Sequence, residues 1–371
     1  MTYEIGKLSL ETLVRPVAKA TESLARLDER LARSPVREGW IERLHFHDAA
    51  AALWLAGELV HVEDLVFHDT DMDLRAPTHE LTRAHAVLRM RRRIQSQPRN
   101  WALGREGLPE LTGRGRAASA AGSGREGEGA AARNDGVDAW DEREGEGLAD
   151  EFAEIDAVLA RSSRVLAGAD VAAKPLRSDE RPELIYDLDW DEDARLAEWH
   201  AVVADTRGLP DILRAALLLD AWHEIEVLQH GAWIGALLVS ALLRQERVTD
   251  NHLACLHIGA QKISRERRRA RGRNERLLAL VEAVQEAASF GLKEHDRLFL
   301  AREQMERKLR GRRASSKLPG LIDLVLSRPL VTTGMIQATL KVSRQGALDL
   351  ISAFGLRELT GRGRYKGWGI V

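Results

Sequence analysis

Apolar side chains recur at helical spacing along most of the first hundred residues. Leu24, Leu27 and Leu31 form one such set, and Ala49, Leu53 and Leu59 belong to another. Spacings of three and four residues bring side chains to one face of an α-helix, whereas strand-like alternation is rare here. The pattern predicts an N-terminal helical domain over residues 1–103.

The pattern stops in residues 104–147, where Gly, Ala, Arg and Glu replace the large apolar side chains. A segment of this composition buries too little apolar surface to offset the entropy lost on ordering. We expect a flexible linker or surface excursion here.

Helical spacing resumes and predicts a second helical unit over residues 148–309. Its most apolar part, residues 209–243, is apolar around most of the helix circumference. Such helices are surrounded by other helices. The basic residues 310–317 that follow contain few large apolar groups and are expected to form a short hinge.

The last 54 residues, 318–371, predict a helix-turn-helix. A first helix ends at Pro329, whose ring disfavours helix in the residue before it. Thr332 or Thr333 can cap a second helix that buries Met335, Ile336 and Leu340. Lys341 stands in the turn where Gly is usual, which puts a left-handed conformation at that position in doubt.

A third helix is expected from Ser343, its N-cap, to Gly355, its C-cap. The spacing places Ala347, Leu348, Ile351 and Phe354 on its buried face, and Arg344, Gln345 and Asp349 point away. Residues 356–360 and 365–371 then read as a β-hairpin with a basic tip. The fold class is therefore mainly α, with helices followed by a hairpin that together make a winged helix.

Charge changes the picture of the whole chain. The net charge is −2, but residues 261–371 carry 24 Lys and Arg against 11 Asp and Glu. A basic third is where double-stranded DNA would dock. The acidic remainder would repel DNA, or mimic it toward the basic third.

The residues expected at DNA follow from the motif. Recognition helices present their first turn to base edges, so Ser343, Arg344 and Gln345 are expected to read bases. The turn and wing are expected to contact the DNA backbone through Thr332, Lys341, Arg362, Arg364, Tyr365 and Lys366. Half-site recognition also predicts a homodimer.

A run of arginines precedes this region. It comprises Arg267, Arg268, Arg269, Arg271 and Arg273. Such a run is typical of a solvated helix face with ion pairs through Glu266 and Glu275, and auxiliary phosphate contact is the alternative.

The layout resembles the Fic family, helical enzymes that transfer a nucleotide group to protein hydroxyls and often carry a C-terminal winged helix. It is still more similar to a bacterial group that pairs a domain of unknown function with a terminal helix-turn-helix. Residues 220–238, 263–273, 291–297 and 327–370 carry the closer likeness. The resemblance implies a Fic-like helical bundle in front of the winged helix.

The Fic motif itself, His-Pro-Phe-x-(Asp/Glu)-Gly-Asn-Gly-Arg, is degenerate here. Aligning His230 with the general base and Gly235 with the first loop Gly puts Ile234 at the metal-binding acid, Ala236 at the Asn and Leu238 at the Arg. The stretch that would correspond to the inhibitory helix, residues 53–58, keeps only a Glu out of register. A lone imidazole has no workable transfer mechanism, so no catalytic residue is expected.

Other chemistry is poorly supported. The Gly122-x-Gly124-x-x-Gly127 pattern follows no strand, no His or Cys spacing suits a metal, and no cofactor is expected. One cysteine and no long apolar stretch or signal peptide predict a cytoplasmic, nucleoid-associated protein. Two alternatives stay open: a divergent nucleotidyl transferase, and an adapter whose helical part binds a protein.

Overall fold

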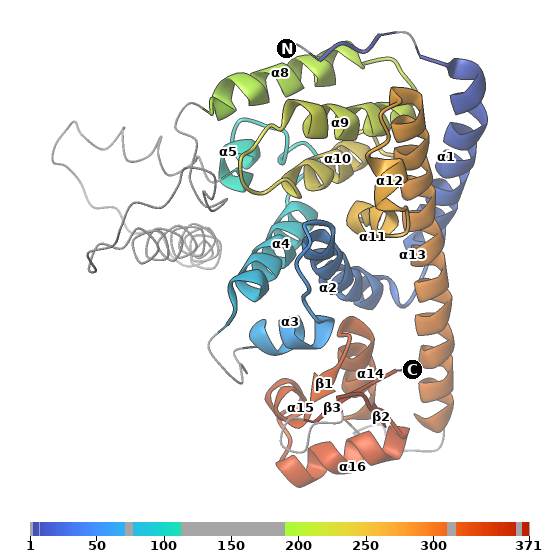
Figure 1. Cartoon of the computed structure of the whole chain (residues 1–371). Helices are drawn as coiled ribbons and strands as arrows, with labels where there is room; N and C mark the ends of the chain where they lie inside the picture. The colour runs from blue at the N-terminus through green and yellow to red at the C-terminus, as the bar shows by residue number, and fades with distance from the viewer. Residues whose placement is uncertain are drawn as a thin grey trace, which may run out of the picture.

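The longest helix among the described residues is α13 (Arg273–Leu309), which runs along one side of the molecule from one end to the other (Figure 1). Leu277, Val281, Val284 and Ala288 lie on one buried stripe of it, with Gly291 continuing the stripe. A Cβ at Gly291 would meet the Leu27 side chain at 2.6 Å and the Trp40 ring at 3.0 Å. The missing side chain therefore lets two other helices pack closely against α13.

The computed structural model describes residues 3–6, 8–70, 77–112, 190–309, 317–360 and 366–370. Besides α13, its helices before residue 310 are α1 (Leu10–Ala32), α2 (Arg37–Leu55), α3 (Val62–His68), α4 (His79–Ser96), α5 (Gly107–Leu111), α8 (Glu192–Asp205), α9 (Asp211–Ile225), α10 (Ile234–Gln245), α11 (Leu256–Gln261) and α12 (Arg265–Arg268). Figure 1 shows α1 beside α13, α8 to α10 at one end and the C-terminal elements at the other. We call the helices α1 to α13 the helical body.

The two ranges predicted as separate helical units share one core. The cluster of buried apolar side chains runs without a break from Leu13 in α1 to Trp368 near the C-terminus. α1 and α2 pack against α13 and α11, so the chain before residue 104 and the chain after residue 190 complete each other. The mainly helical fold class is confirmed.

The predicted linker starts too early. Residues 104–112 are folded, because α5 buries Leu108 and Leu111, and Gly107 sits against the backbone and ring of Trp101. The remainder of the predicted linker, the start of the second helical unit and most of the predicted hinge lie outside the described residues.

A buried charge network ties α2, α4 and α11 together. Asp48 is fully buried, and its carboxylate accepts from Arg91 at 2.6 Å, from the His257 ring at 2.8 Å and from the backbone N–H of Ile258 at 3.0 Å. Burial raises the pKa of Asp48, but these positive and donating groups lower it by more. The carboxylate therefore stays charged and joins three helices inside the core.

The C-terminal elements form a winged helix. They are α14 (Leu318–Ser327), β1 (Val331–Thr332), α15 (Thr333–Leu340), α16 (Arg344–Phe354), β2 (Arg357–Glu358) and β3 (Gly367–Gly369). The predicted hairpin is present as β2 and β3, antiparallel, with Glu358 opposite Trp368. A third strand, β1, was missed by the sequence analysis and pairs with β3 through Val331 and Trp368. No helix among the described residues is long and apolar enough to span a bilayer.

The Asp48 network generates a stability prediction. Replacing Arg91 with Met leaves the Asp48 carboxylate buried beside one ring and one backbone donor, and we expect the free energy of unfolding to fall by about 3–5 kcal/mol. Urea denaturation followed by circular dichroism measures it. The control Arg26→Met removes an exposed ion pair to Glu22 and should change stability by less than about 1 kcal/mol. Equal urea midpoints for the two variants would contradict the role assigned to Asp48.

Candidate nucleic-acid interface

Two N-caps and one C-cap bound the helices α15 and α16. The Thr332 hydroxyl accepts from the Met335 N–H at 3.1 Å and caps α15, and the Ser343 hydroxyl accepts from the Gly346 N–H at 3.1 Å and caps α16. Gly355 ends α16 at φ 64°. These three predictions are confirmed, and together they give the helix-turn-helix.

The sequence analysis put a left-handed conformation at Lys341 in doubt, and the structure shows that Lys341 adopts it. Lys341 adopts the left-handed conformation, with φ 53° and ψ 54°, and ends α15. A residue with a Cβ pays roughly 1–2 kcal/mol for this conformation. The packing of α15 on α14 and α16 therefore holds the turn that a Gly usually makes.

Thr332 does not belong to the exposed surface. It is only 4% exposed, and its side chain caps α15 from within the three-stranded sheet. Thr332 was expected to contact the DNA backbone. Its hydroxyl instead faces the helix that it starts, so its role in the structure is to cap α15.

The first turns of α16 carry exposed polar side chains. Arg344 and Gln345 are both exposed, and the Gln345 amide donates to the Asp349 carboxylate at 2.9 Å. Among the described residues none forms an ion pair with Arg344. The expected base-reading positions thus lie on the surface at the N-terminus of the recognition helix, with Asp349 beside them.

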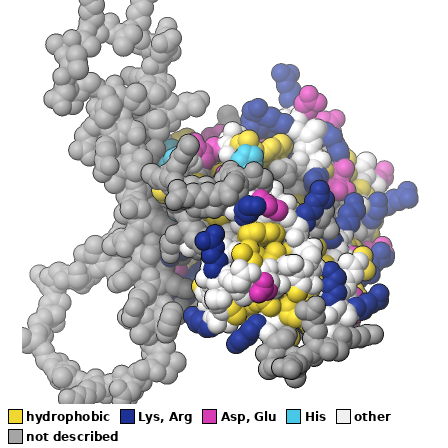
Figure 2. All heavy atoms as spheres, turned by 90° about the horizontal axis from the view of Figure 1, so that it is seen from below, with side chains coloured by type: hydrophobic (Ala, Val, Ile, Leu, Met, Phe, Trp, Pro, Cys, Tyr) yellow, Lys and Arg dark blue, Asp and Glu magenta, His cyan; other side chains and the backbone are white. Residues whose placement is uncertain are grey.

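Leu348 differs from the prediction. Ala347, Ile351 and Phe354 are buried as expected, but Leu348 is 36% exposed on the same side of α16 as Arg344. Figure 2 looks onto the end of the molecule that carries α16, where apolar side chains lie among surrounding Lys and Arg side chains. The surface is therefore mixed, with cations around an apolar area.

Part of the wing is described. Lys366 is exposed and pairs with Glu358 at 3.1 Å across β2 and β3, while the Leu359 N–H donates to the Gly367 oxygen at 2.8 Å. The expected wing contacts Arg362, Arg364 and Tyr365 lie outside the described residues and stay predictions.

The arginine run, expected to make auxiliary phosphate contacts, lies away from the winged helix. It begins in α12 and ends at the start of α13, whereas the winged helix lies at the far end of α13 (Figure 1). A helix of 37 residues is about 55 Å long, which is more than one DNA half-site spans. The run is also not one continuous helix face, since α12 stops at Arg268.

Three members of the run have partners within the chain. Arg273 donates to the backbone oxygens of Glu4 and Ile5 and lies over the Tyr3 ring. Arg268 donates to the Ile263 oxygen at 3.1 Å. Arg267 is exposed and pairs with Glu282 at 2.5 Å, and Arg269 and Arg271 are exposed. Arg273 therefore anchors the N-terminal segment.

A set of charged side chains that the sequence analysis missed docks the winged helix on the helical body; Arg43 and Glu294 are buried and Arg297 is half-buried. Arg43 of α2 donates to the Arg328 oxygen at 2.5 Å, just after the end of α14, and pairs with Glu294 of α13 at 3.0 Å. Arg297 binds the same Glu294 at 2.6 Å and donates to the Ile370 oxygen at 3.0 Å. These residues form one chain of charges that joins the body to the winged helix at two places, after α14 and after β3.

A second junction lies beside the first. Asp69 pairs with Arg328 at 2.5 Å and with Arg92 at 2.6 Å, and both guanidinium groups lie over the Phe46 ring. Burial raises the pKa of Asp69, but hydrogen bonds from the His85 ring and Arg92, and the Arg92 and Arg328 charges, lower it well below its ordinary value. The carboxylate is therefore charged at the junction.

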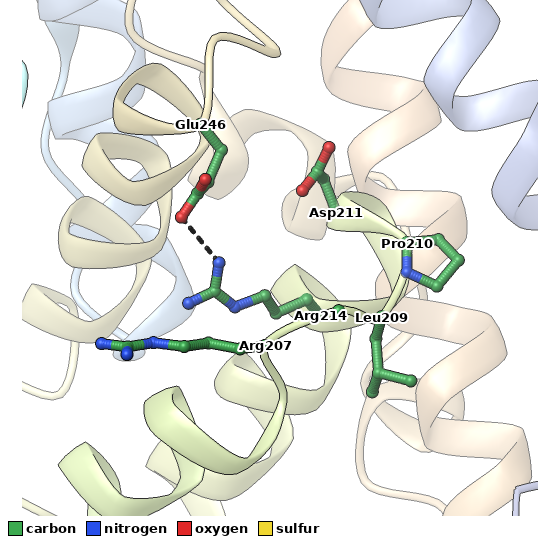
Figure 3. A pocket seen from close by; sticks show the side chains of 7 residues that line it. Arg207, Leu209, Pro210, Asp211, Arg214 and Glu246 are labelled. Atoms are coloured by element: carbon green, nitrogen blue, oxygen red, sulfur yellow. Dashed lines mark hydrogen bonds and ion pairs between the residues drawn. The ribbon is translucent and has the colours of Figure 1, made fainter.

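Two hollows were also found among the described residues. One, of about 1030 Å³, runs along α2 beside α14 and α15 and is lined by Gly39, Leu324 and Leu340 among others. The other, of about 520 Å³, lies at the start of α9, where Arg214 pairs with Glu246 at 2.8 Å near Asp211 (Figure 3). Burial, and then Glu246, raise the pKa of Asp211. The first hollow adjoins the winged helix and the second does not.

Residues aligned with the Fic motif pack in the core. Ile234, Leu237 and Leu238 are buried in α10, and a Cβ at Gly235 would meet the Trp222 ring at 2.4 Å. Close packing of α10 on α9 is therefore sufficient reason for a glycine at this position. Glu58, the residue left over from the second motif, pairs with Arg83 of α4.

The arrangement of α14, β1, α15, α16, β2 and β3 defines a winged helix-turn-helix. A family model described as an HTH DNA binding domain matches residues 318–371, and one described as a protein of unknown function (DUF1612) matches residues 184–310. The chain is 47% identical to the "Uncharacterized protein y4cF" of Sinorhizobium fredii (strain NBRC 101917 / NGR234), and the match covers 100% of both. The chain belongs to the same family as this relative, with a DUF1612 domain followed by a helix-turn-helix DNA-binding domain.

The charged junction generates a pH prediction. Burial raises the pKa of Glu294, but the hydrogen bond from Arg297 and the Arg43 charge lower it by more, so it lies below the ordinary value of 4.5. The stabilisation is then complete above that value and is lost as the pH falls through the lowered pKa. We expect the urea midpoint to drop from about pH 5 downward, and Glu294→Gln to flatten this drop.

Urea midpoints at pH 7, 5, 4 and 3 measure the effect. Glu29→Gln is the control, since Glu29 pairs with Arg33 on the exposed face of α1 and should leave the slope unchanged. An identical pH slope for wild type and Glu294→Gln would show that this carboxylate does not stabilise the docked winged helix.

Proposed function

We propose that the protein is a transcriptional regulator that binds double-stranded DNA as a homodimer through its winged helix. The observation that carries the proposal is the exposed first turn of α16, where Ser343 caps the helix and Arg344 and Gln345 reach the surface. Recognition helices place this turn at base edges in the major groove. The family match over residues 318–371 supports the same class of function.

The charge distribution supports the proposal. Residues 318–371 carry seven Lys and Arg against three Asp and Glu, and Lys341, Arg344 and Lys366 are all exposed. Such a surplus attracts the phosphate backbone, and the wing and turn would supply those contacts. A DNA-binding role would place the protein at the nucleoid.

We propose that the helical body regulates or pairs the chains and does not catalyse nucleotide transfer. The buried Ile234 and Leu238 stand where the resemblance to Fic enzymes requires an acid and an Arg. Without a metal ligand or a phosphate-binding cation, the exposed His230 has no transfer chemistry to assist.

Titration of DNA with variants of the protein tests the interface. Arg344→Ala and Gln345→Ala should each cost about 1–3 kcal/mol on the specific site and much less on random DNA, because bidentate contacts discriminate between bases. Arg362→Ala and Arg364→Ala should weaken specific and random binding alike and lower the salt dependence by about one ion per lost phosphate contact.

Arg207→Ala is the matched control, since this exposed cation lies in the helical body at the start of α9. Fluorescence anisotropy across salt concentrations, on a site selected from random duplexes, gives both quantities. If all four variants bound as wild type, the winged helix would not be the DNA-reading surface, and the protein-adapter alternative would replace the regulator.

Incubation with labelled ATP and Mg²⁺ tests the absence of transferase activity. We expect no label on the protein or on added bacterial extract, because the chain lacks the acid and the Arg of the Fic motif. Labelling that is lost in His230→Ala would establish the divergent transferase instead.

A further inference from the structure

An exposed apolar side chain, Leu348, lies among the polar residues of α16 that we propose face DNA. Leu348 lies one helical turn after Arg344, and the two residues share a side of α16. Leu350 and Ala353 pack partly against the core, whereas Leu348 is 36% exposed and contributes to no core cluster of the described residues. The fold of the winged helix therefore does not account for a leucine at this position.

The side chains around Leu348 indicate which kind of binding partner it contacts. Arg344, Gln345 and Asp349 surround it with polar groups on the same surface. A stable protein interface buries about 800 Å² on each partner and is depleted of charge at its centre. The side chains next to Leu348 on the exposed side of α16 are charged or amide groups, so this turn of the helix suits a polar surface that offers a small apolar group.

The major groove of DNA is such a surface. Each base pair there offers hydrogen-bond donors and acceptors, and thymine adds the C5-methyl group, which is the group that apolar side chains recognise. A rise of 1.5 Å per residue separates positions 344 and 348 by about 6 Å. Base pairs are about 3.4 Å apart, so the two side chains would reach base pairs about two steps apart.

We propose that Leu348 is a specificity-determining residue that contacts the C5-methyl group of a thymine, one or two base pairs from a guanine bound by Arg344. This inference rests on the proposed DNA-binding function and deepens it. It predicts that each half-site of the bound DNA contains one thymine at which the loss of the C5-methyl group measurably weakens binding.

Removing that methyl group is the direct test. Sites are first selected from random duplexes with the full-length wild-type protein, and each thymine is then replaced singly by uracil, which lacks only the methyl. At one position in each half-site, uracil should weaken wild-type binding about three- to fivefold, the effect of exposing one methyl group. At a position where no side chain contacts the thymine methyl group, replacement by uracil should leave the affinity unchanged.

The variant Leu348→Ala completes a double-mutant cycle. It should bind the thymine site about three- to tenfold more weakly than wild type and should no longer distinguish thymine from uracil at that position. Leu300→Ala, at an exposed leucine of α13, is the control and should keep the full difference. Circular dichroism confirms that both variants are folded.

The outcomes separate this inference from the function on which it rests. Wild-type protein that binds thymine and uracil equally at every position, while Arg344→Ala still weakens binding, overturns the role of Leu348 and leaves DNA binding intact. Leu348→Ala that keeps the uracil penalty assigns the methyl contact to another side chain. Wild-type protein that enriches no duplex defeats both proposals.

Discussion

A buried guanidinium group determines how the winged helix sits on the helical body. Arg43 is in α2, and a charge removed from water needs partners of opposite charge or good acceptors. It finds Glu294 in α13 and the backbone oxygens of Val325 and Arg328, which α14 leaves unpaired where it ends. One side chain thus joins three helices, and the end of α14 is positioned by the body.

The orientation of the recognition helix follows from that end. Directly after α14, Pro329 and Leu330 lead into β1, which pairs with β3 and so joins the first and last parts of the domain. Thr332 closes the strand and starts α15 in the same step, because its side chain caps the helix. α16 is then placed by the turn at Lys341, and its first residues face outward.

The sequence predicted what depends on neighbours in the chain. Caps such as Ser343 and Gly355 obey local backbone chemistry, and the apolar stripes gave the helices. Contacts between distant segments could not be predicted in this way: Arg43 and Glu294 are 251 positions apart, and no local pattern of residues pairs them. Leu348 was misplaced because it lies at the edge of the apolar stripe, where only the packed neighbours decide between core and surface.

The length and fixation of α13 bear on how a dimer would read DNA. The helix carries Arg297, which donates to the Ile370 oxygen of the winged helix, and Glu294, which pairs with both Arg297 and Arg43. Its other end packs beside α1 and α9. Charges buried in this way tolerate little displacement, because moving one leaves its partner unpaired. In the proposed homodimer each recognition helix would be fixed to its own helical body, so the distance between the two recognition helices would not adjust freely. The distance between half-sites would instead follow from the surface through which the helical bodies pair, so that the body sets spacing while α16 sets sequence.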